Sequence, residues 1–183
     1  AFNSLWTIVN DKKNIEWKIK YILMCISIKL NPIHFLNKVN EIFQDISSYM
    51  NEEGGIEFLA DVLLLLSTSI RLIMEINVSM VNTKIIETIV SSLKKQHQNP
   101  ILIISTLSLF LSMIEWGQKL FQKEEVVCPF FEFITWVSSL SKEENHWKKD
   151  ENELIKILND TINARVNIHI QPNDYYTRKL DSS

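Results

Sequence analysis

The chain contains 183 residues, of which 46% are hydrophobic and 22% are charged, and its formal net charge is −3. This composition is that of a folded domain with a hydrophobic core, and it excludes disorder over most of the length. The three glycines and four prolines are too few for an all-β domain rich in tight turns or for a glycine-rich nucleotide fold, and the negative net charge provides no overall attraction to nucleic acid.

Apolar residues recur every three or four positions along nearly the whole chain, which predicts an all-α fold. Asn31-Pro32 ends the first helix, because the residue before a proline is disfavoured in the α region. Gly54-Gly55 marks the clearest break, and Pro129 fits the first turn of a later helix. The apolar segment 56–76 is either one helix or two with a bend near Ser67. The predicted helices span 15–30, 32–50, 56–76, 84–96, 100–116, 117–123, 130–140 and 151–164.

The two ends of the chain give separate indications about its organisation. In Val166–Ile170 apolar and polar residues alternate, so we expect residues 165–183 to form an extended, strand-like or partly disordered tail. The chain begins at Ala1 and enters an apolar-patterned segment directly. We therefore expect the helical domain, residues 1–164, to be part of a longer protein.

An internal repeat is the most informative pattern in the sequence. The segment 89–93 (Ile-Val-Ser-Ser-Leu) matches 136–140 (Trp-Val-Ser-Ser-Leu) at an offset of 47 residues. The same offset places 62–64 (Val-Leu-Leu) on 109–111 (Leu-Phe-Leu), and a fainter third copy lies at 46–49. A helical unit of this size cannot bury its own apolar face, so such units stack on their neighbours.

This period, and the order of long helix, short helix and third helix, resemble the armadillo and HEAT repeat superfamily over residues 1–164. The resemblance implies a right-handed α-solenoid that binds other proteins. The sequence departs from armadillo repeats because it has almost no glycine at the corners between helices and lacks the asparagine that peptide-binding members place on the third helix. A non-repetitive helical bundle with chance Ser-Ser-Leu matches is the alternative.

The sequence contains no recognisable catalytic or metal-binding motif. The four histidines are scattered without the spacing of metal ligands, and glycine-rich phosphate loops and nucleophile elbows are missing. Cys128 precedes Pro129 near a predicted helix start, where a thiol pKa can fall, but a buried residue explains it more simply. We therefore expect a protein that is not an enzyme and needs no cofactor or metal.

No segment of the sequence is predicted to cross a membrane. Segment 56–76 is apolar but carries four charged residues, and the uncharged segment 100–114 is shorter than the ~20 residues that a spanning helix needs. Cys25 and Cys128 lie inside apolar runs and do not suggest a disulfide framework, which favours a reducing compartment. The expected location is intracellular, either cytoplasmic or nuclear.

The resemblance places the partner-binding surface on the third helix of each repeat. With Ile86, Val90 and Leu93 facing inward, small polar residues of these helices face outward. We also expect the tail to contribute a recognition segment. The candidate partner-binding residues are Gln44, Ser47, Lys84, Thr88, Ser91, Phe131, Thr135, Ser138, Tyr175 and Tyr176.

The expected function is that of a scaffold or adaptor that binds a segment of a partner protein. The alternative is a regulatory subunit that contacts nucleic acid or chromatin-associated proteins, through basic clusters such as Lys94-Lys95. The sequence does not indicate an oligomeric state.

Overall fold

The computed structural model describes residues 17–76, 84–96, 99–116, 121, 123–140 and 147–169. Within these ranges the secondary structure is helical with short turns and contains no strand, which confirms the all-α prediction. The helices are α2 (Trp17–Leu30), α3 (Pro32–Gln44), α4 (Ile46–Met50), α5 (Gly55–Ile76), α6 (Lys84–Gln96), α7 (Pro100–Trp116), α8 (Glu124–Leu140) and α9 (Lys149–His169).

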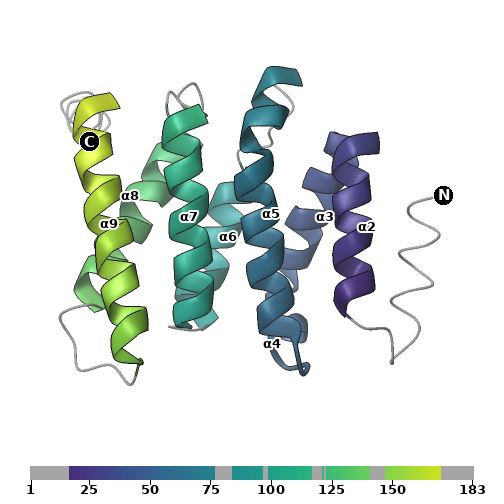
Figure 1. Cartoon of the computed structure of the whole chain (residues 1–183), viewed down its shortest axis with the longest axis horizontal. Helices are drawn as coiled ribbons and strands as arrows, with labels where there is room; N and C mark the ends of the chain where they lie inside the picture. Colours follow the sequence, from purple (N-terminus) through teal and green to yellow (C-terminus); the bar gives the residue numbers. More distant parts are fainter. Residues whose placement is uncertain are drawn as a thin grey trace.

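The helices form two rows (Figure 1). The front row contains α2, α5, α7 and α9, and each of these helices contacts the next. The back row contains α3, α6 and α8, which also contact one another in that order. Contacts between α2 and α3, and between α8 and α9, join the rows at their ends.

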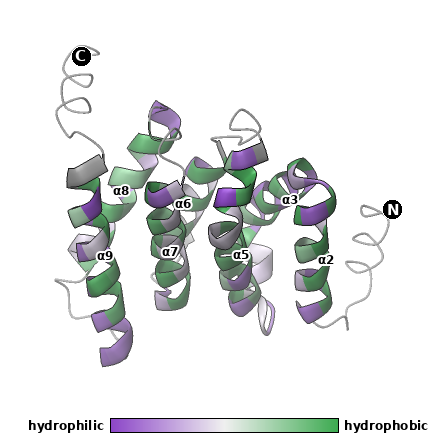
Figure 2. Cartoon of the chain, turned by 45° about the horizontal axis from the view of Figure 1, so that its top comes forward, coloured by the Kyte–Doolittle hydropathy of each residue, from purple (hydrophilic) through white to green (hydrophobic). Residues whose placement is uncertain are grey.

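The hydrophobic core lies between the two rows. Phe110 of α7 meets Phe130 and Phe133 of α8 edge to face, with ring centroids 4.9 and 5.4 Å apart. All three side chains are fully buried. Hydrophobic residues run along the helices of both rows, whereas polar residues gather toward several helix ends (Figure 2). Helix α7 is strongly hydrophobic because it packs against α5, α9 and, through Phe110, against α8.

The predicted helix 32–50 is in fact two helices, α3 and α4. Pro32 occupies the first turn of α3 as predicted, and the side chain of Asn31 accepts a hydrogen bond from the His34 amide at 3.3 Å. Asp45 interrupts the helix with φ −111° and ψ 35°. The Asp45 carboxylate accepts a hydrogen bond from Ser48 Oγ at 2.7 Å, a local contact that competes with helix continuation.

The break at Gly54-Gly55 is confirmed, and its cause is steric. Gly54 has φ +77°, a conformation that costs glycine little and other residues more. A Cβ atom at Gly54 would lie 2.5 Å from Cδ1 of Trp17. The Trp17 indole N–H donates to the carbonyl of Glu53, so α2 holds this turn against the start of α5.

The structure resolves one predicted alternative and corrects one predicted boundary. Segment 56–76 lies in one continuous helix, α5. Helix α8 begins at Glu124, so the predicted start at 130 is wrong, and Pro129 lies inside the helix. The amides of Val126 and Val127 bond to the Lys123 carbonyl, and both side chains are buried. The two buried side chains therefore fix the first turn of α8. Pro129 comes after this turn, and because it has no backbone N–H it removes one hydrogen bond of the helix.

The last helix continues to His169, so the prediction of an extended chain from Arg165 onward is wrong for 165–169. Val166 is buried, and Arg165 forms an ion pair with Glu115 of α7. These tertiary contacts outweigh the local alternation of apolar and polar residues. The rest of the predicted tail, 170–183, and the predicted helix 117–123 apart from Phe121 and Lys123 lie outside the described residues.

None of the helices in the described ranges combines the length and hydrophobicity that crossing a membrane requires. This finding agrees with the sequence prediction for segments 56–76 and 100–114.

Candidate partner-binding groove

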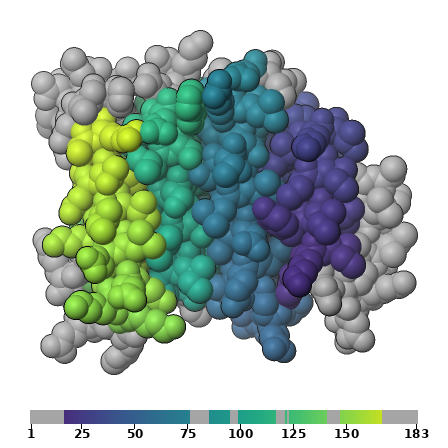
Figure 3. Space-filling view, in the orientation of Figure 1, coloured from purple at the N-terminus to yellow at the C-terminus, as the bar shows by residue number. Residues whose placement is uncertain are grey.

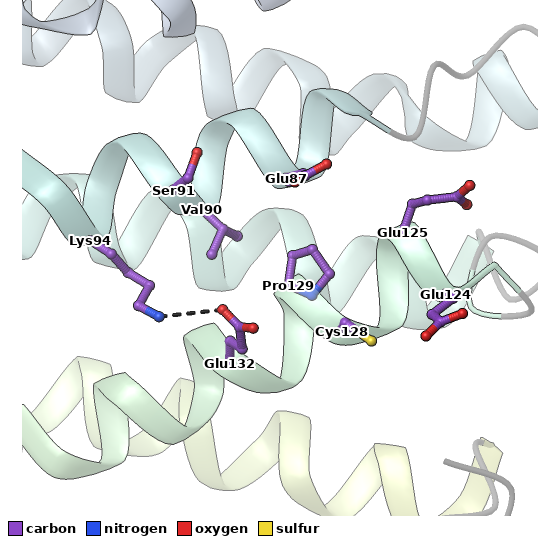
Figure 4. Close-up of a pocket in the computed structure, with 9 residues that line it drawn as sticks. All are labelled: Glu87, Val90, Ser91, Lys94, Glu124, Glu125, Cys128, Pro129 and Glu132. Carbon is purple, nitrogen blue, oxygen red and sulfur yellow. Dashed lines mark hydrogen bonds and ion pairs between the residues drawn. The ribbon is translucent and has the colours of Figure 1, made fainter. Parts of the chain in front are cut away.

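An open groove lies between α6 and α8 on the back row (Figure 4). Its volume is about 610 Å³. Four of its lining residues belong to α6 and five belong to α8. The lining residues are Glu87, Val90, Ser91, Lys94, Glu124, Glu125, Cys128, Pro129 and Glu132.

The base of the groove is apolar, and its walls are charged. Val90 is 2% exposed and points toward α8, while Pro129 is half-buried and points toward α6. On either side of them, Glu87 of α6 and Glu132 of α8 are exposed, which keeps their carboxylates in water. Charged groups of this kind resist burial between helices, so the two helices pack through their buried faces and leave the outer space open.

The groove carries an excess of negative charge. Lys94 Nζ lies 3.3 Å from Glu132 Oε2, and this is an exposed ion pair between the two helices. Glu87, Glu124 and Glu125 have no ion-pair partner among the described residues. Among the described lining residues, four glutamates and one lysine give a net charge of −3. Such a site attracts positively charged groups.

Of the predicted partner-binding residues whose side chains the structure describes, Ser91 alone lines this groove. Its hydroxyl donates to the Thr88 carbonyl at 3.2 Å, and Thr88 itself is half-buried on α6 outside the lining. Thr135 is exposed on α8 and is not among the lining residues. Val90, Ile86 and Leu93 are buried, as expected.

Two predicted residues of α8 make contacts inside the protein. The Phe131 ring packs against Phe130 with centroids 5.2 Å apart. The Ser138 hydroxyl accepts a hydrogen bond from Asn159 Nδ2 of α9 at 2.8 Å, so Ser138 links the two rows. Both residues are half-buried.

The remaining predicted residues are dispersed. Gln44 is exposed at the end of α3, and Ser47 is half-buried on α4. Lys84 begins α6, but its side chain is outside the described part of the structure. Tyr175 and Tyr176 also lie outside the described residues.

The sequence contains a signal for the groove that repeat alignment does not use. Glu87 and Lys94 are seven residues apart, as are Glu125 and Glu132, so each pair lies on one side of its helix. Alignment of repeats selects equivalent positions, such as Ser91 and Ser138, which occupy the same side of successive helices. A groove between neighbours is instead lined by the facing sides of two helices, which are not equivalent positions.

Clear pKa shifts occur away from the groove, around α2, α4 and α5. Burial raises the pKa of Tyr49 to about 12, with a further contribution from Asp45. Burial, and then the negative charge of Glu57, raise the pKa of Asp61 above its ordinary value. Burial lowers the pKa of Lys20, whose ammonium lies 4.3 Å from the centre of the Trp17 ring.

These groups have structural or solvent-exposed surroundings. Tyr49 is part of an aromatic cluster, stacked on Phe58 with centroids 5.8 Å apart, and Asp61 is mostly exposed. Within the described ranges, no group of three histidine, cysteine or acidic side chains is arranged to hold a metal ion. Within the described residues, the groove between α6 and α8 is therefore the candidate site for a ligand.

A second exposed apolar surface lies on α2, at one end of the front row (Figure 1). It consists of one stripe of aliphatic side chains that are between 44% and 78% exposed: Ile19, Ile22, Ile26 and Leu30. This stripe belongs to a single helix. The groove has two walls and a floor, so a partner segment in it is contacted from more than one side.

No protein-family model, curated protein or solved structure matches the chain.

Proposed function

We propose that the chain is a non-catalytic scaffold or adaptor module that binds a segment of a partner protein in the groove between α6 and α8. The two rows of helices and the repeat in the sequence support a right-handed α-solenoid of the armadillo or HEAT type as its architecture. In such arrays, partners bind along surfaces that successive repeats build together.

The observation that carries this proposal is the groove itself. Its volume of about 610 Å³ lies within the range of sites that bind small ligands or short segments. From Glu124 to Glu132 the groove follows α8 for roughly 12 Å at 1.5 Å per residue. About four residues of an extended chain cover that distance at roughly 3.3 Å each.

The charge of the groove favours a protein over nucleic acid. Nucleic-acid binding depends on neutralising phosphates with lysine and arginine. Among the described lining residues Lys94 is the one lysine, and it is paired with Glu132. Glu87, Glu124 and Glu125 repel phosphate, so the nucleic-acid alternative gains no support from this surface.

The proposal is tested by filling the groove. Ser91→Trp places a large ring between α6 and α8, and the matched control Ser139→Trp places the same ring on an exposed position of α8 outside the lining. We expect wild type and Ser139→Trp to capture the same partner from cell extract, and Ser91→Trp to lose it while its circular dichroism spectrum stays helical.

Equal capture by both variants would show that the groove is not the binding site. If the wild-type chain captures no partner at all, the scaffold function itself is contradicted.

A further inference from the structure

We propose that the groove between α6 and α8 selects a positively charged partner segment, with an arginine or lysine directed between Glu87 and Glu125. This inference rests on the proposed function, because it specifies the chemistry of the segment that the groove accepts.

The glutamates without an ion-pair partner among the described residues lie at the beginnings of two neighbouring helices. Glu87 is in the first turn of α6, and Glu124 and Glu125 are in the first turn of α8. A helix dipole stabilises acidic residues at such positions on any protein. Here the two first turns lie beside each other and border one cavity, so their negative charges act on the same space (Figure 4).

The two ends of the groove differ in charge. At one end Lys94 and Glu132 neutralise each other at 3.3 Å. At the other end Glu87, Glu124 and Glu125 lack a cation among the described residues. A bound segment therefore gains the most electrostatic binding energy when its arginine or lysine lies at the end bordered by these three glutamates.

The apolar floor of the groove matches the aliphatic part of an arginine or lysine side chain. Val90, Pro129 and Cys128 form an apolar strip between the charged walls. Lysine and arginine have long aliphatic stems that cover apolar surface while the charged group stays in a polar environment. A segment with arginine has the further advantage of a planar group that binds carboxylates through two hydrogen bonds.

The test uses three fluorescein-labelled hexapeptides of one sequence, in which two positions are both arginine, both glutamine or both glutamate. Binding to the full chain is measured by fluorescence anisotropy at low and high salt. We expect the arginine peptide to bind most tightly. Its affinity should fall as salt is added, because salt screens the exposed charges of the groove. Glu87→Gln combined with Glu125→Gln should weaken it about tenfold.

The matched control combines Glu57→Gln with Glu153→Gln, which changes the net charge equally at exposed positions on α5 and α9. It should leave the affinity unchanged. Equal binding of the arginine and glutamine peptides, an equal loss in both variants, or no binding of the arginine peptide would overturn the inference. If the glutamine peptide binds equally well and Ser91→Trp abolishes its binding, the proposed groove function stands and the charge preference alone fails.

A second measurement uses Cys128, which lines the groove, as a local probe of charge. In a Cys25→Ser background it is the sole cysteine of the chain. Its thiolate attacks one sulfur of cystamine, which forms a mixed disulfide and releases the other half as cysteamine. The reaction is repeated with the anionic disulfide dithiodiglycolate.

We expect the ratio of the cystamine rate to the dithiodiglycolate rate to be about tenfold higher in this background than after Glu87→Gln and Glu125→Gln are added, because local charge concentrates cations. An identical ratio in the two proteins would contradict an electrostatic preference of the groove.

Discussion

The α5–α7 pair in the front row and the α6–α8 pair in the back row are both neighbours in a row of helices, but they meet in different ways. Between α5 and α7, Ser67 Oγ donates to the Ser108 carbonyl at 3.1 Å and lies 2.7 Å from Ser112 Oγ. Side chains of α5 and α7 form an unbroken surface (Figure 3). Between α6 and α8, glutamates and Lys94 border an open groove.

The difference follows from side-chain size and charge. Serine occupies little space, and its hydroxyl finds partners on the neighbouring helix, so two helices approach closely along α5 and α7. Glutamate and lysine are long and must stay hydrated, so they leave space above the buried base of α6 and α8. The same array thus presents a closed face and a grooved face, and the grooved face is the one on which we propose that a partner binds.

The largest expected effect comes from the core that both pairs share. Phe110→Ala removes the ring that contacts Phe130 and Phe133, so the free energy of unfolding should fall by about 3–5 kcal/mol. Glu125→Ala in the groove wall should change it by less than about 0.5 kcal/mol. Urea unfolding followed by circular dichroism measures both. Comparable losses would mean that the groove wall is structural.

A matched pair of serine substitutions tests the comparison directly. Ser67→Leu forces a larger side chain between α5 and α7 and removes the hydroxyl contacts, so we expect a loss of about 1–3 kcal/mol. Ser91→Leu enters open space and should cost less than about 0.5 kcal/mol. The same urea experiment applies. A costly Ser91→Leu would show that α6 and α8 are as closely packed in solution as α5 and α7.

Helix positions were largely predictable from the sequence because they depend on local periodicity. The ranges 84–96 and 100–116 match α6 and α7, and apolar spacing also identified the buried residues of α6. The errors arose where tertiary contacts decide the conformation, as for the helical start before Pro129 and the helical continuation at Val166.

The groove could not be predicted in the same way, because it depends on which sides of two helices face each other. Repeat alignment placed Ser91 and Ser138 on one common surface. The structure places Ser91 at the groove and Ser138 against Asn159 of α9. The rotation of each helix about its own axis is set by long-range packing. The repeat offset in a single sequence carries no information about that packing.

The smallest expected effect concerns a charge on the closed face, at Asp61 of α5. Burial and the neighbouring Glu57 raise the pKa of Asp61, so its protonated form is favoured in the folded chain. A raised carboxyl pKa contributes stability below the unfolded-state pKa, and that contribution is lost as pH rises through the folded-state pKa. At neutral pH the ionised carboxylate therefore weakens the fold slightly.

Asp61→Asn should accordingly stabilise the chain at pH 7 by less than about 0.5 kcal/mol, since Asp61 is mostly exposed and solvent screens its charge. The gain should shrink as pH falls through the folded-state pKa. An NMR titration of the Asp61 carboxyl measures the pKa itself, and Glu57→Gln should lower it only part of the way because burial is the larger cause. If Glu57→Gln removes the whole shift, the charge of Glu57 dominates, and the carboxylate at Asp61 is as well hydrated as an ordinary surface group.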